Sequence, residues 1–325
     1  MTDDREYMEM VVAAVKAESP QIRSVELRSV SAILPPWTAG SHVRVRLPSG
    51  ETRSYSLINA DPEKAAIDRP QSYRLGVRLE ESSKGGSRYI HDLKPGDRVW
   101  ISRPENRFQL EVGEQRPLLL AGGIGVTPLL SMAATLRASG AGFDMVYAGR
   151  SRDQLAFLSE LEALCDGNLT IHADDQSGIL NMAAILDGLA TDRPVYICGP
   201  KPMLDAAIEY ARKQEWPEGR LNFEIFAEPQ SQEGDQPFDV ELSPSGKRVH
   251  VAADQTILAA LLAAGEDVMY DCERGDCGMC QARVLAGVPD HRDYYLSDAD
   301  RASNGLIQTC VSRSKTSLLV LEFDQ

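Results

Sequence analysis

Four cysteines near the C-terminal end of the chain have a spacing that can hold an iron–sulfur cluster. Cys272 is followed after four intervening residues by Cys277, after two more by Cys280, and after a further 29 by Cys310. This is the plant-type spacing of a 2Fe–2S site, in which the last thiolate arrives from a distant strand. We therefore predict a 2Fe–2S centre whose metal ligands are Cys272, Cys277, Cys280 and Cys310.

The residues between these cysteines favour the same chemistry. Gly275 and Gly278 permit the backbone angles that a chain needs to wrap tightly around a cluster. Structural zinc is the alternative, but zinc ribbons usually offer two Cys-x2-Cys knuckles, and only Cys277 and Cys280 form one here. The other two cysteines stand alone. The first ten residues are acidic and do not form a secretory signal, so we expect a cytoplasmic protein with free thiols or metal ligands and no disulfide framework.

Two glycine-containing turns follow apolar runs in the middle of the chain. The sequence GGIGVTP at 122–128 ends one such run and opens a predicted helix, and CGP at 198–200 ends another. Backbone N–H groups at such a turn can bind the phosphates of a dinucleotide. The alternatives are a tight strand–helix turn without a ligand and, for Cys198, a small buried residue without a direct role. No Walker lysine follows, which argues against nucleotide hydrolysis.

The surrounding patterns divide the chain into three domains and a linker. Residues 1–112 are rich in short alternating runs with turn signals between them, which predicts an antiparallel β-barrel with one small helix near 87–93. Residues 113–228 alternate strand and helix four times, as in a parallel α/β sheet. Residues 229–237 are polar and read as a linker, and 238–325 form a small β-rich domain with a helix at 255–265.

The charge excludes several classes of partner. Aspartate and glutamate number 48 against 34 lysines and arginines, giving a net charge of −14. A surface of that sign repels phosphate backbones and anionic lipids, so we expect neither nucleic-acid nor membrane binding. No apolar run approaches the roughly 20 residues that cross a bilayer. The five histidines are scattered, and we read them as structural or surface residues: His42, His91, His172, His250 and His291.

Taken together, the motifs resemble a known family. RSYSL (53–57), VRLEESSKGGSRYI (77–90), PENRFQL (104–110), LLLAGGIGVTP (118–128), VYICGP (195–200), NFEIF (222–226), PDHRDYYL (289–296) and the cysteine set cover nearly the whole chain. They resemble the phthalate dioxygenase reductase type of the ferredoxin–NAD(P) reductase superfamily, which includes vanillate demethylase and carnitine monooxygenase reductases. The resemblance implies an FMN-binding barrel, a nicotinamide-binding α/β domain and a C-terminal β-grasp ferredoxin domain, in that order.

The resemblance also implies roles for individual residues. The FMN would be lined by Arg53, Ser54, Tyr55 and Ser56, and its phosphate side held by Arg78, Gly85, Gly86 and Ser87. The nicotinamide dinucleotide would lie against Gly122, Gly123, Gly125, Thr127, Pro128, Cys198, Gly199 and Pro200. Phe226 would lie against the flavin. The catalytic candidates are Ser56, Cys198 and Phe226.

One departure from the family bears on the nicotinamide. Where relatives usually carry one arginine followed by an acidic or amide residue, this chain has Arg150, Ser151, Arg152 and Asp153. A serine between two arginines could hold a 2′-phosphate. We expect NADH as the donor, with NADPH still open.

The function implied is an NADH-dependent reductase component of a two-component Rieske-type oxygenase. Hydride would pass from NADH to FMN, and single electrons would leave through the cluster. Residues 236–325 carry 14 acidic and 8 basic side chains, and Asp271, Glu273 and Asp276 would form an acidic rim for a basic acceptor. Two alternatives are a free-standing flavin diaphorase or oxidase and an iron–sulfur redox sensor.

Overall fold

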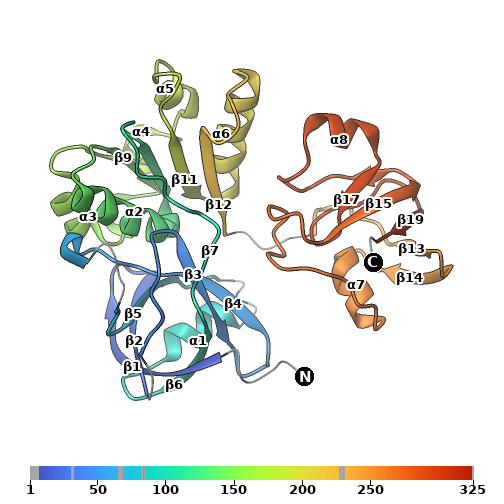
Figure 1. The fold of residues 1–325 in the computed structure, drawn as a ribbon, viewed down its shortest axis with the longest axis horizontal. Coiled ribbons are helices and arrows are strands. Elements are labelled where there is room, and N and C mark those ends of the chain that lie inside the picture. The colour runs from blue at the N-terminus through green and yellow to red at the C-terminus, as the bar shows by residue number, and fades with distance from the viewer. Residues whose placement is uncertain are drawn as a thin grey trace. The chain divides into compact units, whose positions relative to one another are not determined.

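The computed structural model describes residues 7–30, 33–64, 69–81, 83, 85–226 and 231–323. The chain divides into two compact units, Met1–Glu224 and Ile225–Gln325. The first holds a β-sheet domain and an α/β domain (Figure 1). The second holds the four clustered cysteines. The domain boundaries expected from the sequence remain predictions, and the expected linker begins outside the described residues.

The first domain is an antiparallel sheet that closes on itself. Its path runs β4-β3-β6-β1-β2-β5. A bridge between Leu57 and Leu75, with a hydrogen bond from Ile58 N to Arg74 O at 2.8 Å, joins the two ends. Alternating buried and partly buried residues, as in β3, fill the interior. The elements are β1 (Tyr7–Ala17), β2 (Ile22–Ser29), β3 (Ser41–Arg46), β4 (Thr52–Ser56), η2 (Pro62–Lys64), β5 (Tyr73–Arg78), α1 (Gly86–Asp92), β6 (Arg98–Ser102) and β7 (Glu105–Asn106).

The second domain is built on a sheet of order β10-β9-β8-β11-β12. The pairs β10–β9, β9–β8 and β8–β11 are parallel, and every residue of β8 and β11 is buried, as expected where helices cover both faces. Helix α2 packs on α3, and α5 packs on α6. The elements are β8 (Leu118–Gly122), η3 (Gly123–Gly125), α2 (Val126–Ser139), β9 (Asp144–Gly149), η4 (Arg152–Gln154), α3 (Leu158–Cys165), β10 (Leu169–Ala173), α4 (Asp174–Ser177), α5 (Met182–Leu186), β11 (Val195–Gly199), α6 (Lys201–Lys213) and β12 (Leu221–Ile225).

The second unit contains a mixed sheet of order β14-β13-β19-β15-β17 and a separate two-stranded antiparallel sheet of β16 with β18. The central pair β13–β19 is parallel, and the two thiols Cys280 and Cys310 belong to the buried core beside it. The elements are β13 (Phe238–Ser243), β14 (Lys247–Val251), α7 (Ile257–Ala263), β15 (Gln281–Ala286), β16 (Pro289–Asp290), α8 (Asp298–Ser303), β17 (Leu306–Gln308), β18 (Arg313–Ser314) and β19 (Leu318–Glu322).

The three predicted architectures are confirmed: an antiparallel β domain, a parallel α/β domain and a mixed-sheet ferredoxin-like domain. Among the described helices, none is both long and apolar enough to cross a membrane.

Candidate functional site

The four predicted cluster ligands come from two segments of the second unit. Cys272 and Cys277 are half-buried in the loop before β15, Cys280 immediately precedes β15, and Cys310 follows β17. Cys280 and Cys310 are each 2% exposed. The antiparallel pairing of β15 with β17 brings these distant ligands together, because Gln281 lies opposite Gln308 in the register. The cluster site is therefore open on the side of Cys272 and closed on the side of the core.

The sulfur atoms interact with one another. A hydrogen bond with Cys277, and a second with Cys310, lower the pKa of the Cys272 thiol, and a hydrogen bond with Cys310 lowers the pKa of Cys280 to about 7. The backbone N–H of Arg274 points at the sulfur of Cys272 at 3.3 Å. Hydrogen bonds with Cys272 raise the pKa values of Cys277 and Cys310 in turn. Four thiols held this closely, with a backbone donor aimed at sulfur, fit the ligand set of a 2Fe–2S cluster.

Two positions in this loop must be glycine, because neighbouring residues lie too close for a side chain. Gly275 and Gly278 have φ values of +81° and +80°. A Cβ on Gly278 would lie 2.4 Å from a ring carbon of Tyr295, and one on Gly275 would lie 2.6 Å from Val311. An alanine at either position would displace the loop that carries the ligands.

An aspartate lies among these thiols. Oxygen and sulfur atoms of Asp276, Cys272 and Cys277 all fall within 4.8 Å of one another. Burial, followed by the charge of Cys272, raises the pKa of the Asp276 carboxyl to about 7. Of the three acids predicted to form a rim, Asp276 is thus held in the loop itself, and Asp271 and Glu273 flank Cys272.

The strand β4 carries the residues predicted to line a flavin. Its Arg53 and Tyr55 face the start of α1, because a Cβ on Gly86 would lie 2.7 Å from Arg53 Cγ and 3.1 Å from the Tyr55 hydroxyl. Gly85, with φ +105°, has open space where a Cβ would be. The structure therefore brings Arg53, Tyr55, Gly85 and Gly86 together.

Ser56 ends this strand with a buried hydroxyl. Its side chain is 3% exposed, and its Oγ has no hydrogen-bond partner among the described residues. A buried polar group is normally paired, so an orphaned hydroxyl indicates a partner from outside the protein. This unpaired hydroxyl is consistent with the predicted contact between Ser56 and a flavin, which stays a prediction.

Two other predicted flavin residues have partners within the protein. The hydroxyl of Ser87 accepts a hydrogen bond from Glu80 N at 3.1 Å and donates one to Ser83 at 3.0 Å. Arg78 lies 4.0 Å from a carboxylate oxygen of Glu80. Ser87 thus has a structural role in holding the loop before α1, and its contact with a phosphate stays a prediction.

The two glycine-containing turns of the α/β domain lie side by side. Strands β8 and β11 are neighbours, with Cys198 opposite Ala121. A Cβ on Gly125 would lie 2.2 Å from the carbonyl oxygen of Cys198, and one on Gly199 would lie 3.1 Å from Gly122 Cα. Cys198 is fully buried. Such close backbone contact leaves no room for side chains, which is how a sheet edge admits a dinucleotide.

A buried serine joins this domain to the flavin strand. Ser131 of α2 donates a hydrogen bond to Leu57 O at 2.9 Å and accepts one from Asn59 N at 2.9 Å. Nearby, a Cβ on Gly76 of β5 would lie 2.8 Å from the methyl group of Thr127. The strand predicted to hold the flavin and the helix predicted to hold the nicotinamide are thus fixed to each other. Neither contact is predictable from the sequence, because no motif pairs Ser131 with Leu57 or Gly76 with Thr127.

Two of the polar side chains in the loop after β9 already bind carboxylates of the protein. Arg152 donates to Glu162 at 3.1 Å, and the Ser151 hydroxyl donates to Asp153. Arg150 is exposed. These contacts leave fewer groups for a 2′-phosphate.

The remaining predicted residues are placed as follows. Phe226 follows β12 and is partly buried, and its predicted contact with a flavin stays a prediction. His91 Nε2 is hydrogen-bonded to the backbone carbonyl oxygen of Val77 at 2.8 Å, and His172 Nε2 to that of Gly178 at 2.8 Å. His250 pairs with Asp239 on the surface, and His291 lies 3.8 Å from Asp293. His42 is partly buried in β3, opposite Ser56.

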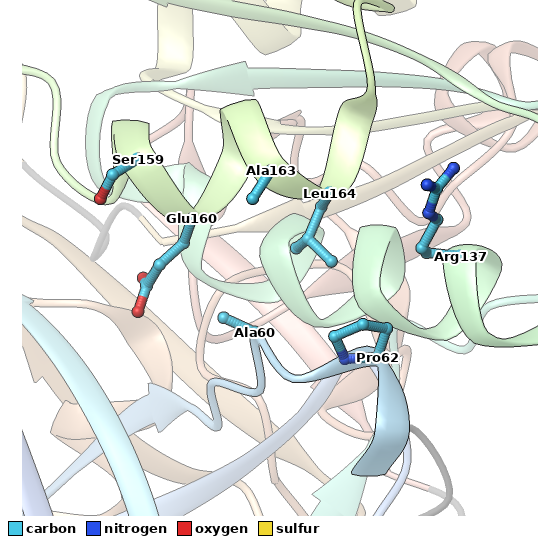
Figure 2. A pocket seen from close by; sticks show the side chains of 7 residues that line it. All are labelled: Ala60, Pro62, Arg137, Ser159, Glu160, Ala163 and Leu164. Atoms are coloured by element: carbon cyan, nitrogen blue, oxygen red, sulfur yellow. The ribbon is translucent and has the colours of Figure 1, made fainter.

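A hollow of about 450 Å³ lies elsewhere in the first unit (Figure 2). Ala60 and Pro62 of the loop after β4 face Glu160 and Leu164 of α3 across it. Glu160 pairs with Arg74 at 2.7 Å, which ties the β domain to α3. None of the predicted site residues lines this hollow, so we do not assign the nicotinamide or flavin to it.

The comparisons with known proteins agree with both halves of this geometry. Residues 240–315 match the family model of the 2Fe-2S iron-sulfur cluster binding domain, and residues 119–209 match that of the oxidoreductase NAD-binding domain. These matches confirm the predicted 2Fe–2S and nicotinamide domains.

Relatives extend over the full length of the chain. A vanillate O-demethylase oxidoreductase of Pseudomonas sp. (strain HR199 / DSM 7063) is 40% identical over 97% of this chain and 99% of its own. The beta subunit of a heme-dependent oxidative N-demethylase of Ectopseudomonas mendocina (strain ymp) is 39% identical over 97% and 98%. The structure of phthalate dioxygenase reductase, described as modular for electron transfer from pyridine nucleotides to 2Fe–2S, is 33% identical with a TM-score of 0.74, covering 98% and 99%.

Proposed function

Since the chain belongs to the phthalate dioxygenase reductase family of oxidoreductases, we propose that it carries electrons from NADH through FMN and a 2Fe–2S cluster to a separate oxygenase component. It is an oxidoreductase with a flavin site, an NAD-binding domain and a 2Fe–2S domain. The observation that carries the proposal is that one chain combines three features. The glycine-containing turns of β8 and β11 form a sheet edge that suits a dinucleotide, and Ser131 joins this edge to the strand that ends in the unpaired Ser56 hydroxyl. The same chain carries four thiols that interact with one another.

The order of the carriers follows from their chemistry. Nicotinamide gives two electrons together as hydride, a 2Fe–2S cluster takes one, and a bound flavin can do both. The protein's part is to position them. The close backbone contact between Gly125 and Cys198 shapes the sheet edge, and the bond from Ser131 to Leu57 fixes that edge against β4. The Ser56 hydroxyl is the donor that we assign to the flavin N5.

We assign NADH as the donor in preference to NADPH. Two observations support this: the guanidinium of Arg152 is paired with Glu162, and the hydroxyl of Ser151 is turned toward Asp153. A 2′-phosphate needs free donors at the end of the second strand, and it is repelled by a carboxylate such as Asp153. Parallel titrations of flavin reduction with NADH and NADPH test this point, and a lower KM for NADPH contradicts it.

The acceptor that we propose is an oxygenase with a Rieske centre. The name of the vanillate relative and that of phthalate dioxygenase reductase support an oxygenase partner. The acidic excess of residues 236–325, with Asp271 and Glu273 beside the open side of the cluster site, favours a basic docking surface. A heme-dependent partner is the second candidate, because the Ectopseudomonas relative is the subunit of a heme-dependent demethylase. All six thiols are free, which suits a cytoplasmic location.

The proposal is tested by measuring two steps separately: the reduction of the flavin by NADH, and the exit of electrons through the cluster. Cys280→Ala removes a cluster ligand at the edge of the core. We expect this variant to reduce ferricyanide with NADH at a rate close to wild type but to lose reduction of cytochrome c, a one-electron protein acceptor. If cytochrome c reduction persists, electrons leave without the cluster, and a free-standing diaphorase becomes the better account.

A further inference from the structure

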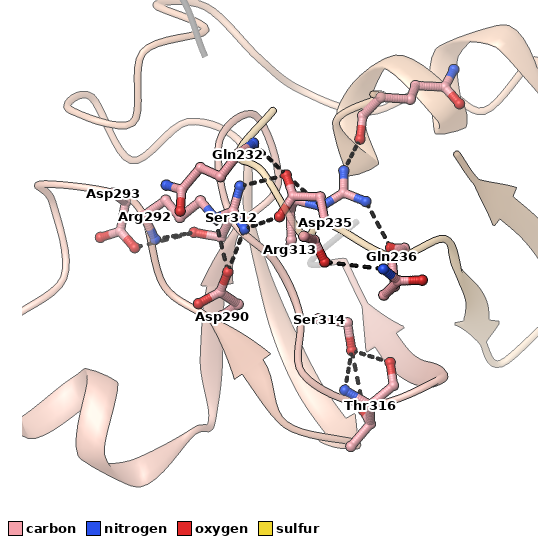
Figure 3. A network of polar contacts seen from close by, with 12 residues as sticks. Gln232, Asp235, Gln236, Asp290, Arg292, Asp293, Ser312, Arg313, Ser314 and Thr316 are labelled. Atoms are coloured by element: carbon pink, nitrogen blue, oxygen red, sulfur yellow. Dashed lines mark hydrogen bonds and ion pairs between the residues drawn. The ribbon is translucent and has the colours of Figure 1, made fainter. Parts of the chain in front are cut away.

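The carboxylate of Asp235 lies between two arginines. Asp235 belongs to the entering segment, residues 231–237, which precedes β13 in the second unit. Asp235 is 8% exposed, and its oxygens accept hydrogen bonds from both terminal nitrogens of Arg292, at 2.5 and 3.0 Å. The Nε of Arg313 lies 3.5 Å from the same carboxylate. Figure 3 shows Asp235 between the two guanidinium groups. Breaking one partner of a buried ion pair leaves an uncompensated charge, which is strongly destabilising.

The other donors of the two arginines are also satisfied. Arg313, which is 6% exposed, donates to the carbonyl oxygens of Gln236 at 3.0 Å, Ala252 at 3.1 Å and Gln255. Arg292 donates from Nε to Asp290 at 2.8 Å. The group is therefore an ion cluster that holds the entering segment, the two-stranded sheet of β16 with β18 and the loop before α7 together.

This ion cluster is connected to the segment that carries Cys310. The backbone N–H of Arg292 donates to the Ser312 hydroxyl at 3.1 Å, and that hydroxyl donates to Asp293 at 3.3 Å. Ser312 comes two residues after Cys310 and is fully buried. The position of Arg292 thus sets the position of the chain just past the fourth ligand.

It is also connected to the loop that carries Cys272 and Cys277. The backbone N–H of Tyr294, two residues after Arg292, donates to Gly275 O at 2.9 Å. A Cβ on Gly275 would lie 3.1 Å from Asp293 Cα, so the two backbones are packed directly on each other. The segment 292–294 therefore supports the ligand loop from one side.

We propose that Asp235 is a positioning residue for the iron–sulfur cluster. By pairing with Arg292 and Arg313, it holds the segments on which both ligand-bearing stretches rest, so that the entering segment of the chain is part of the cluster site. The inference rests on the 2Fe–2S domain, and it is independent of which acceptor the protein serves.

The test measures release of iron from the intact protein. Wild type, Asp235→Asn, Arg292→Gln and the double variant are incubated with a ferrous iron chelator, bathophenanthroline disulfonate, under reducing conditions, and the coloured complex is followed. We expect Asp235→Asn to release iron at least about five-fold faster than wild type, because the buried Arg313 loses its carboxylate partner and Arg292 keeps only Asp290. The double variant is expected to release iron no faster than the faster single variant, because both changes break one pair.

The matched control is Asp239→Asn, which makes the same change in the same unit at a carboxylate paired with His250 on the surface. It should release iron like wild type. NADH-dependent ferricyanide reduction should stay within about two-fold of wild type in every variant; its absence in wild type itself would refute the proposed function without bearing on Asp235.

Equal release rates in wild type and Asp235→Asn overturn the inference, and so do strictly multiplicative effects of the two single changes. If Asp235→Asn is isolated without a cluster, the rate of iron release from Arg292→Lys tests the inference instead. This variant keeps the charge but cannot make both bonds. Faster release than wild type supports the positioning role, and release at the wild-type rate overturns it.

Discussion

The hydroxyl of Ser131 donates a hydrogen bond to the backbone carbonyl oxygen of Leu57 across 2.9 Å. Ser131 belongs to the helix that follows the glycine-rich turn, and Leu57 directly follows the strand predicted to hold the flavin. Ser131 is 1% exposed, so no water replaces the bond when it is lost. Together with the ion pair between Arg74 and Glu160, this buried hydroxyl holds the strand predicted to bind the flavin against the helix that follows the glycine-rich turn.

Ser131→Ala should therefore destabilise the first unit and slow hydride transfer. Two backbone groups, Leu57 O and Asn59 N, lose their partner in a buried place, which costs about 1–3 kcal/mol of unfolding free energy. Urea unfolding followed by fluorescence measures the loss, and rapid mixing with NADH measures the rate. Ser139→Ala is the control, since that exposed hydroxyl bonds only within its own helix end. Equal stability of the two variants would contradict the assignment.

Gly125→Ala should weaken nicotinamide binding severely. The added Cβ would lie 2.2 Å from Cys198 O and 2.7 Å from Gly199 N, and both are backbone atoms that cannot move without displacing the turn. We expect the KM for NADH in ferricyanide reduction to rise by an order of magnitude or more, with flavin content unchanged. In Gly142→Ala the Cβ meets only the flexible side chain of Arg116, at 3.3 Å, so this control should behave as wild type.

Ser56→Ala should affect the flavin without harming the fold. Because the hydroxyl has no partner among the described residues, its removal leaves no protein group unsatisfied. We expect flavin-free protein to unfold at the wild-type temperature or slightly above it, while hydride transfer to bound flavin slows by about ten-fold, a typical effect of losing one hydrogen bond of about 1.4 kcal/mol.

The control for Ser56 is Ser24→Ala. Ser24 is also buried, but its hydroxyl donates to Glu18 at 2.6 Å, so its loss should lower the unfolding temperature. A Ser56→Ala variant with normal hydride transfer would remove Ser56 from the site.

The unfolding free energy of the α/β domain should decrease at low pH because of Asp144. Hydrogen bonds from Arg116, and then from Arg193, lower the pKa of this carboxyl below its ordinary value near 3.8. A carboxyl with a lowered folded-state pKa stabilises the fold above its unfolded pKa and loses that contribution as the pH falls below about 4. The urea midpoint of wild type should thus exceed that of Asp144→Asn at pH 7, and the gap should shrink toward pH 3. A gap independent of pH would contradict this.

The sequence alone was enough for the cluster, because ligand spacing reflects the chemistry of the metal directly. The match to the 2Fe-2S family model confirms the cluster. The thiols of Cys272, Cys277, Cys280 and Cys310 interact with one another, and their role as the four ligands stays a prediction. The two glycine turns were also predictable, since a close backbone approach such as that of Gly125 to Cys198 excludes every larger residue. The layered α/β pattern followed from the continuous apolar runs of β8 and β11.

Contacts between segments far apart in sequence could not be predicted from the sequence. Ser131 sits in an apolar helix where a serine has no pattern of its own, and its partner Leu57 is 74 positions away. Asp235 lies in a polar stretch that reads as exposed linker, yet it is buried because Arg292, 57 positions later, folds back onto it. The pairing of a single charge across such a separation leaves no periodic signal.

The central claim is that electrons from nicotinamide reach the iron–sulfur cluster by way of the flavin. It is tested most directly by mixing the purified protein rapidly with NADH in the absence of oxygen and following flavin absorbance together with the electron paramagnetic resonance of the reduced cluster. The account predicts that flavin bleaching precedes the cluster signal in wild type, and that Ser131→Ala slows both in the same proportion. A cluster signal that arises before the flavin is reduced, or that never arises, would contradict it.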